Sequence, residues 1–171
     1  MPVRPIIICK DGPTMGITCY LSRLLWLIFN RAYGCKTFSN GADAVHALEQ
    51  YVKDGHLRST TLFATFNVND VCTRYPHEET INALKDFLNS CGTEQQDEFG
   101  DNLTNEIIIQ LVRLVLDNQF FVYQNKLYQQ IKGSASGSLL TILLACIYLL
   151  HCQPTLMTAL ANNKNDQLFG R

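Results

Sequence analysis

The sequence predicts an α+β fold. Of the 171 residues, 47% are hydrophobic and 17% are charged, a composition that is able to build a hydrophobic core. Apolar residues recur at helical spacing in several segments, and β-branched or aromatic residues gather in a few shorter ones. These helices and strands do not alternate regularly, and no internal repeat or long linker divides the chain. We therefore expect one α+β domain over residues 1–171.

The first third of the chain is expected to hold a strand and two helices. The β-branched run at residues 3–9 predicts the strand. Pro13 is placed in the first turn of a helix that ends near Gly34 and buries the apolar residues Ile17, Tyr20, Leu21, Leu24, Leu25 and Ile28. Asn40 is a favourable N-cap for a second helix, which closes near Gly55 and carries Ala44, Val45, Leu48 and Val52.

The middle of the chain predicts a strand and two further helices. β-branched and aromatic residues indicate the strand at 60–67. Pro76 opens a helix whose inward residues are Ile81, Leu84, Phe87 and Leu88. The polar residues 92–102 form a surface loop. Thr104 begins a helix whose inward residues are Ile108, Leu111, Val112, Val115 and Leu116.

The last third of the chain predicts a hairpin followed by a core helix. Residues 120–123 and 126–131 are the two strands of this hairpin, and small residues at 133–138 lead into an apolar helix over 139–150. Pro154 is expected to interrupt this helix before a final short one near 156–160. Because a helix needs about 20 apolar residues to cross a bilayer, the apolar run at 139–150 predicts a core helix and no membrane anchor.

The charge and the cysteine content limit which partners and which cellular compartment are expected. The net charge of −1 gives no global basic signature, so nucleic-acid binding must depend on local patches. The seven cysteines include no Cys-x-x-Cys pair, which favours a reducing, intracellular compartment. The four histidines show no ligand spacing with them, so no zinc site is expected. The N-terminus lacks the pattern of a signal peptide.

Two polar residues follow the strand predicted at 60–67. Asn67 lies at its end, and Asp70 comes three residues later. A strand end that presents oxygen ligands is able to hold the magnesium pair of nucleotidyl transfer, with the ions about 3.5–4 Å apart. Asn67 offers a neutral amide oxygen where this chemistry uses a carboxylate, so weak metal binding is expected. Two turn residues after a strand are the simpler interpretation.

The segment Gly-Ser-Ala-Ser-Gly-Ser at 133–138 is a second candidate site. Small residues leave backbone N–H groups accessible, and the N-terminus of the following helix favours anions. The spacing matches neither a P-loop nor a Rossmann loop. The alternative is a flexible connection between the hairpin and the core helix.

Basic and aromatic side chains form a third group of candidates. Arg4 and Lys10 flank the first strand and are able to bind phosphates, although isolated basic residues are more often solvated. The hairpin carries aromatic residues that are able to stack on bases: Phe120, Phe121, Tyr123 and Tyr128. Alternating aromatics of this kind more often pack across strands and in cores. Nucleophilic catalysis has no local motif in this chain.

The order and spacing of these segments resemble the reverse transcriptases of Penelope-like retroelements. The resemblance runs from Arg4-Pro5-Ile6-Ile7 through Asn67-Val68-Asn69-Asp70 to the segment 130–138, so it covers nearly the whole chain. It also includes the linking segments 54–58, 75–79, 121–123 and 128–131. The resemblance implies a partial right-hand polymerase fold with helices packed on a small antiparallel sheet. Residues up to about 60 would belong to the fingers, and residues 61–171 to the N-terminal palm.

The resemblance also implies an activity, a cofactor and partners. The family transfers deoxynucleotides from a deoxynucleoside triphosphate to a DNA primer on an RNA template, using two Mg²⁺ ions. By position, Asn67 corresponds to the first catalytic aspartate, Val68 supplies a backbone carbonyl to a metal, and Asp70 lies at the metal and triphosphate. Nucleotide and template contacts are implied for Arg4, Lys10, Cys72, Gly133, Ser134, Ala135, Ser136, Gly137 and Ser138.

The chain departs from the family pattern at some of these positions. Asn67 replaces an acid, Cys72 replaces an aromatic residue, Ser136 replaces a methionine and Leu139 replaces a common proline. Residues 168–171 resemble the lead-in to the Tyr-x-Asp-Asp hairpin, whose carboxylates this sequence does not contain. We therefore expect a reverse transcriptase domain fragment that is inactive by itself. The alternatives are a non-catalytic nucleic-acid-binding remnant and a translated relic without a biochemical role.

Overall fold

The structure, a computed structural model, describes residues 7, 12–34, 38, 40–63, 68, 70–91 and 103–160, with the side chains of 154–160 left out. These residues form helices and one two-stranded antiparallel sheet, which makes the described chain α+β. The elements in chain order are α1 (Met15–Tyr33), α2 (Gly41–Lys53), α3 (Val71–Arg74), α4 (His77–Ser90), α6 (Asn105–Asp117), β1 (Phe120–Tyr123), β2 (Lys126–Gln129) and α7 (Leu139–Leu160).

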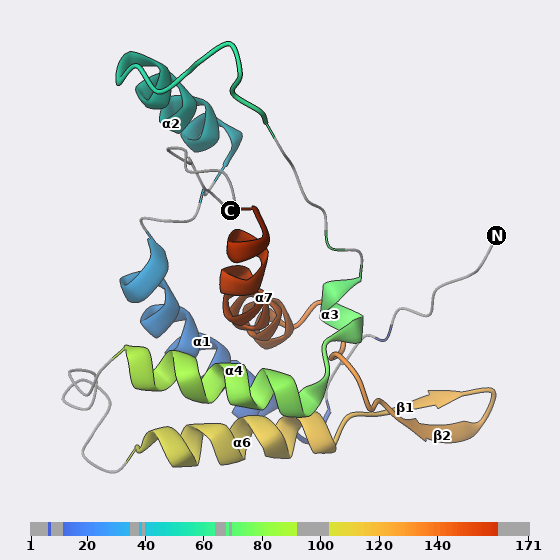
Figure 1. The fold of residues 1–171 in the computed structure, drawn as a ribbon. Helices are drawn as coiled ribbons and strands as arrows, with labels where there is room; N and C mark the ends of the chain where they lie inside the picture. The colour runs from blue at the N-terminus through green and yellow to red at the C-terminus, as the bar shows by residue number, and fades with distance from the viewer. Residues whose placement is uncertain are drawn as a thin grey trace.

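Four helices share one hydrophobic core (Figure 1). Helix α4 packs between α6 and α7, and α1 contacts the same two helices. All four contribute fully buried apolar side chains: Leu21, Leu25, Leu84, Leu88, Val112, Leu116, Leu140, Leu143, Leu144 and Ile147. Most of these residues lie on the apolar faces that helical spacing predicts, and burying each leucine stabilises the fold by about 2 kcal/mol.

Helix boundaries follow the expected capping residues. The Asn40 side chain accepts a hydrogen bond from the Asp43 N–H at 3.0 Å at the start of α2. Thr104 caps α6 in the same way, with its hydroxyl accepting from the Ile107 N–H at 3.3 Å. Gly34 follows α1 at once. The capping predictions for these three helices are therefore confirmed.

Polar contacts also connect α4 to its neighbours at the surface. Arg113 of α6 donates two hydrogen bonds to the carboxylate of Glu78, one of them 2.9 Å long from Nη2 to Oε2. The hydroxyl of Tyr148 on α7 donates to Glu79 Oε2 at 3.0 Å. Burial and the hydrogen bond to Glu79 raise the pKa of Tyr148 to about 12, so the hydroxyl keeps its proton at neutral pH.

The predicted hairpin is confirmed, but its place in the fold differs from expectation. β1 pairs with β2 in the register Phe121↔Tyr128, and Gln124 and Asn125 form the turn with φ of 49° and 59°, as in a type I′ turn. The hairpin projects from the helices, and no side chain of either strand is buried (Figure 1). The helices thus pack on one another and not on this sheet, because their apolar stripes cover each other.

Three local expectations are corrected. Residues 60–63 contain no strand, and Leu62 and Phe63 are 91% and 69% exposed. Pro154 does not interrupt α7, because a proline removes only one backbone hydrogen bond and a helix can continue through it. Pro13 lies in a turn before α1 and not in its first turn.

Some apolar residues at helical spacing in α1 and α2 lie outside the core. Tyr20 of α1 is exposed. Helix α2 contains no buried residue and stands apart from the other helices (Figure 1). Its residues Val45 and Val52 are exposed, so its apolar stripe does not join the core.

The strand predicted at 3–9 and the loop predicted at 92–102 lie outside the described residues, apart from Ile7. Within the described part of the chain, no helix is both long enough and apolar enough to cross a bilayer.

Candidate functional site

Two of the segments singled out in the sequence meet in space. The Ser134 N–H donates to the Cys72 carbonyl at 2.8 Å, and the Gly133 N–H donates to the Tyr75 carbonyl at 2.8 Å. An isolated antiparallel bridge joins Pro76 to Lys132. The segment after the predicted strand and the small-residue segment are therefore held side by side. We call residues 70–75 together with 133–138 the α3–loop junction.

Gly133 makes this close approach possible. Its φ of +61° lies in the left-handed region. A Cβ atom there would lie 2.2 Å from the Thr73 carbonyl carbon and 2.6 Å from the Cys72 carbonyl oxygen, distances that real side chains do not tolerate. The ring Nε2 of His77 also lies 2.7 Å from the Gly133 carbonyl oxygen. The glycine is thus required by both backbone conformation and space.

The first half of the 133–138 segment is buried and fully tied to its surroundings. The Gln119 amide donates to the Ser134 hydroxyl at 2.6 Å and accepts from the Ala135 N–H at 3.1 Å. The Thr141 hydroxyl donates to the Ala135 carbonyl at 2.8 Å. These bonds argue against a merely flexible connection. The sequence did not identify Gln119 and Thr141 as partners of this segment. No short sequence pattern predicts that a glutamine will bind a loop 15 residues further along the chain.

The second half of the segment opens toward solvent at the start of α7. The Ser136 N–H donates to the Ile7 carbonyl at 2.7 Å. Gly137 is exposed, and its φ of +88° again favours glycine. Ser138 directly precedes α7, and its carbonyl accepts from the Ile142 N–H at 3.3 Å. Unpaired N–H groups at a helix start favour an anion.

Asp70 lies on the other side of the junction, at the start of α3. Its φ of 58° is left-handed, and its carbonyl accepts from both the backbone N–H and the hydroxyl of Thr73, at 3.0 and 3.1 Å. Its carboxylate lies 3.9 Å from the Arg74 guanidinium. Val68 is exposed. Asn67, Arg4 and Lys10 lie outside the described residues, so their predicted roles stay predictions.

Burial keeps two ionisable groups of the junction neutral. It raises the pKa of the half-buried Cys72 thiol, which therefore favours the thiol over the nucleophilic thiolate. Burial also raises the pKa of the Tyr75 hydroxyl far above its usual value. The Ser134 side chain lowers this pKa and so offsets part of the increase. Among the described residues the Tyr75 oxygen completes no hydrogen bond of normal geometry. Neither group is set up for nucleophilic chemistry.

Among its side chains, the junction contains one carboxylate, that of Asp70. The Asp70 carboxylate faces the guanidinium of Arg74, and its charge is already partly balanced. In the part of the chain that the structure describes, no cluster of three or more His, Cys, Asp or Glu side chains is arranged to hold a metal ion. The magnesium site predicted at Asn67, Val68 and Asp70 therefore stays a prediction.

Comparison of the chain with family models, curated proteins and solved structures finds no match.

Proposed function

We propose that this chain is the fingers and N-terminal palm of a reverse transcriptase domain, similar to those of Penelope-like retroelements, and that it binds nucleic acid without catalysing DNA synthesis by itself. The observation that supports this is the α3–loop junction. The resemblance assigns Asp70, Cys72 and residues 133–138 to contacts with the metal, nucleotide and template. In the structure these two segments hydrogen-bond directly, through Cys72 and Ser134.

The chemistry of the junction suits binding better than catalysis. Small residues next to the start of α7 let a phosphate backbone approach N–H groups and the positive end of the helix. Two-metal transfer needs carboxylates that stabilise charge in the transition state. This chain has Asn67 in place of the first one, and Asp70 lies beside Arg74. Binding without turnover is the expected outcome.

The test places a negative charge where a phosphate is proposed to bind. Ser138→Asp keeps a good N-cap residue at the start of α7, so the fold should tolerate it. We expect this variant to bind a labelled RNA–DNA hybrid about fivefold or more weakly, since two like charges 4 Å apart repel by about 1 kcal/mol even in water. Fluorescence anisotropy at low salt gives the dissociation constant, and binding should weaken steeply as salt rises.

Thr104→Asp is the matched control, because it makes the same charge change at the N-cap of α6. It should leave hybrid binding within about twofold of the wild type, which corresponds to less than 0.5 kcal/mol. The proposal is wrong if the wild type does not bind the hybrid at low salt, if binding is independent of salt, or if the two variants behave alike.

A further inference from the structure

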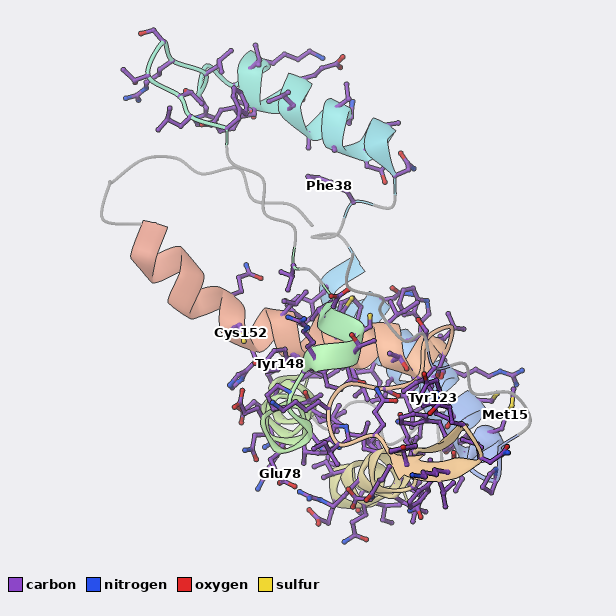
Figure 2. All side chains as sticks on the ribbon, turned by 90° about the vertical axis from the view of Figure 1, so that its right-hand side faces the viewer. Met15, Phe38, Glu78, Tyr123, Tyr148 and Cys152 are labelled. Carbon is purple, nitrogen blue, oxygen red and sulfur yellow. The ribbon has the colours of Figure 1, made fainter. Side chains whose placement is uncertain are left out.

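The β1–β2 hairpin presents aromatic side chains to solvent instead of burying them. Aromatic side chains that alternate along a strand are usually packed across strands or in a core. Here Phe120 is 53% exposed and Tyr123 is 60% exposed, and Tyr128 is also exposed. Figure 2 views the molecule from the side on which the hairpin projects in Figure 1, and Tyr123 is labelled there. A two-stranded sheet with neither face covered is a marginal structure, so these side chains do little for the core.

The register separates the hairpin side chains into two different faces. Phe121, Tyr123, Lys126 and Tyr128 share one face, which we call the tyrosine face, because Phe121 lies opposite Tyr128 and Tyr123 lies opposite Lys126. The rings of Phe121 and Tyr128 are stacked, with centroids 5.6 Å apart and planes at 19°. Phe120, Val122, Leu127 and Gln129 share the opposite face.

The charged side chains of the hairpin segment have one sign. Residues 118–138 contain Lys126 and Lys132 and no acidic residue. The nearest acid before this segment is Asp117, the last residue of α6. Both lysines are exposed. The protein as a whole carries a net charge of −1, so this local excess of positive charge is a distinct feature of the surface.

We propose that the tyrosine face binds a single polynucleotide strand. Bases stack on the aromatic rings of Phe121, Tyr123 and Tyr128, and Lys126 contacts the phosphates. Exposed aromatic rings beside lysines are the combination that recognises unpaired bases irrespective of sequence. An apolar protein partner would fit the opposite face better, since Val122 and Leu127 lie there. The inference goes beyond the proposed polymerase function, because the hairpin is separate from the α3–loop junction.

The test compares two aromatic residues of the same strand that lie on opposite faces. Tyr123→Leu removes a ring from the tyrosine face, and Phe120→Leu removes one of similar exposure from the other face. The probe is a fluorescein-labelled oligouridylate of about 15 nucleotides, a length that spans one typical binding site. Chelator is present, so that no metal contributes. We expect Tyr123→Leu to weaken binding about fivefold or more, and Phe120→Leu to leave it within about twofold.

Lys126 supplies a second, independent measurement. Each lysine contact with a single strand contributes about −0.7 to the slope of the logarithm of the binding constant against that of the salt concentration. Lys126→Gln should therefore reduce the magnitude of this slope by about 0.7, whereas Lys53→Gln on α2 should not change it. Far-UV circular dichroism verifies that all variants are folded.

Three results would overturn this proposal: no binding of the oligouridylate at low salt, equal effects of the Tyr123 and Phe120 substitutions, or tighter binding of a duplex of the same length. The Ser138→Asp variant separates this proposal from the polymerase one. If this variant loses binding of the hybrid and keeps binding of the single strand, both proposals are supported. Each proposal can also fail while the other holds.

Discussion

At the scale of single residues, Gly133 determines the geometry of the candidate site. Its missing side chain lets residues 133 and 134 lie against the backbone of α3, where two hydrogen bonds of 2.8 Å join the segments. The sequence indicated that the small residues at 133–138 allow another group to approach closely. It did not indicate which group this is. The partner is a backbone far away in the chain, and no local pattern encodes it. Gln119 was missed for the same reason.

The cost of filling this contact can be measured with two glycines of the same segment. Gly133→Ala should reduce the free energy of unfolding by at least about 2 kcal/mol, because it combines an unfavourable positive φ with a collision against Thr73. Gly137→Ala carries only the conformational part, since among the described residues no atom beyond its chain neighbours lies within 4 Å of its Cβ position, and should cost about 1 kcal/mol. Urea unfolding followed by circular dichroism gives both values. Equal losses would contradict the close packing at Gly133.

At the scale of elements, helices were predicted better than strands. Apolar spacing and caps are local signals, and α1, α4, α6 and α7 begin and bury residues largely as the sequence indicates. The 60–67 segment shows the limit of this approach. Its β-branched and aromatic residues favour a strand, but a strand needs a partner, and residues 60–63 have no strand pairing in the structure.

The contact between α4 and α6 predicts a dependence of stability on pH. The hydrogen bond from Arg113 lowers the pKa of Glu78, so the folded protein binds this proton less tightly than the unfolded chain. The stabilisation is therefore present above the usual pKa of about 4.3 and is lost as the pH falls through the lower value of the folded state. Because Glu78 is exposed, the effect should be small.

Glu78→Gln measures this effect directly. It should lower the free energy of unfolding at pH 7, and the difference from the wild type should disappear at acid pH, where the wild-type carboxyl is protonated. Glu49→Gln, an exposed change on α2, serves as the control and should show little difference at either pH. A difference for Glu78→Gln that persists in acid would mean that packing, and not charge, stabilises this contact.

At the scale of the whole molecule, a helical core is combined with apolar side chains that remain outside it. Leu62 and Phe63 lie before the junction, and Val122, Leu127 and Ile131 lie on or beside the hairpin, all of them exposed. Unpaired strand edges and apolar patches favour association with other chains. We therefore expect the chain to associate with other chains through these exposed residues.

Replacing the two most exposed of the residues before the junction should reduce this association. Leu62→Asn combined with Phe63→Asn is expected to lower light scattering in concentrated solutions and to leave the thermal midpoint unchanged, because neither side chain is buried. Leu143→Ala in the core is the contrasting variant and should cost about 3 kcal/mol. A lower thermal midpoint in the double variant would show that residues 62 and 63 contribute to the folded core.

The junction between residues 70–75 and 133–138 also orders the events of folding. Its hydrogen bonds connect segments separated by α4, α6 and the hairpin, so the ends can meet at low entropic cost only after those helices have packed. Ser134 is buried, and its N–H is bonded to Cys72, so this amide exchanges with solvent only when the two segments separate. We therefore expect the candidate site to form after the helices have packed, and hydrogen exchange at Ser134 to report how readily it opens.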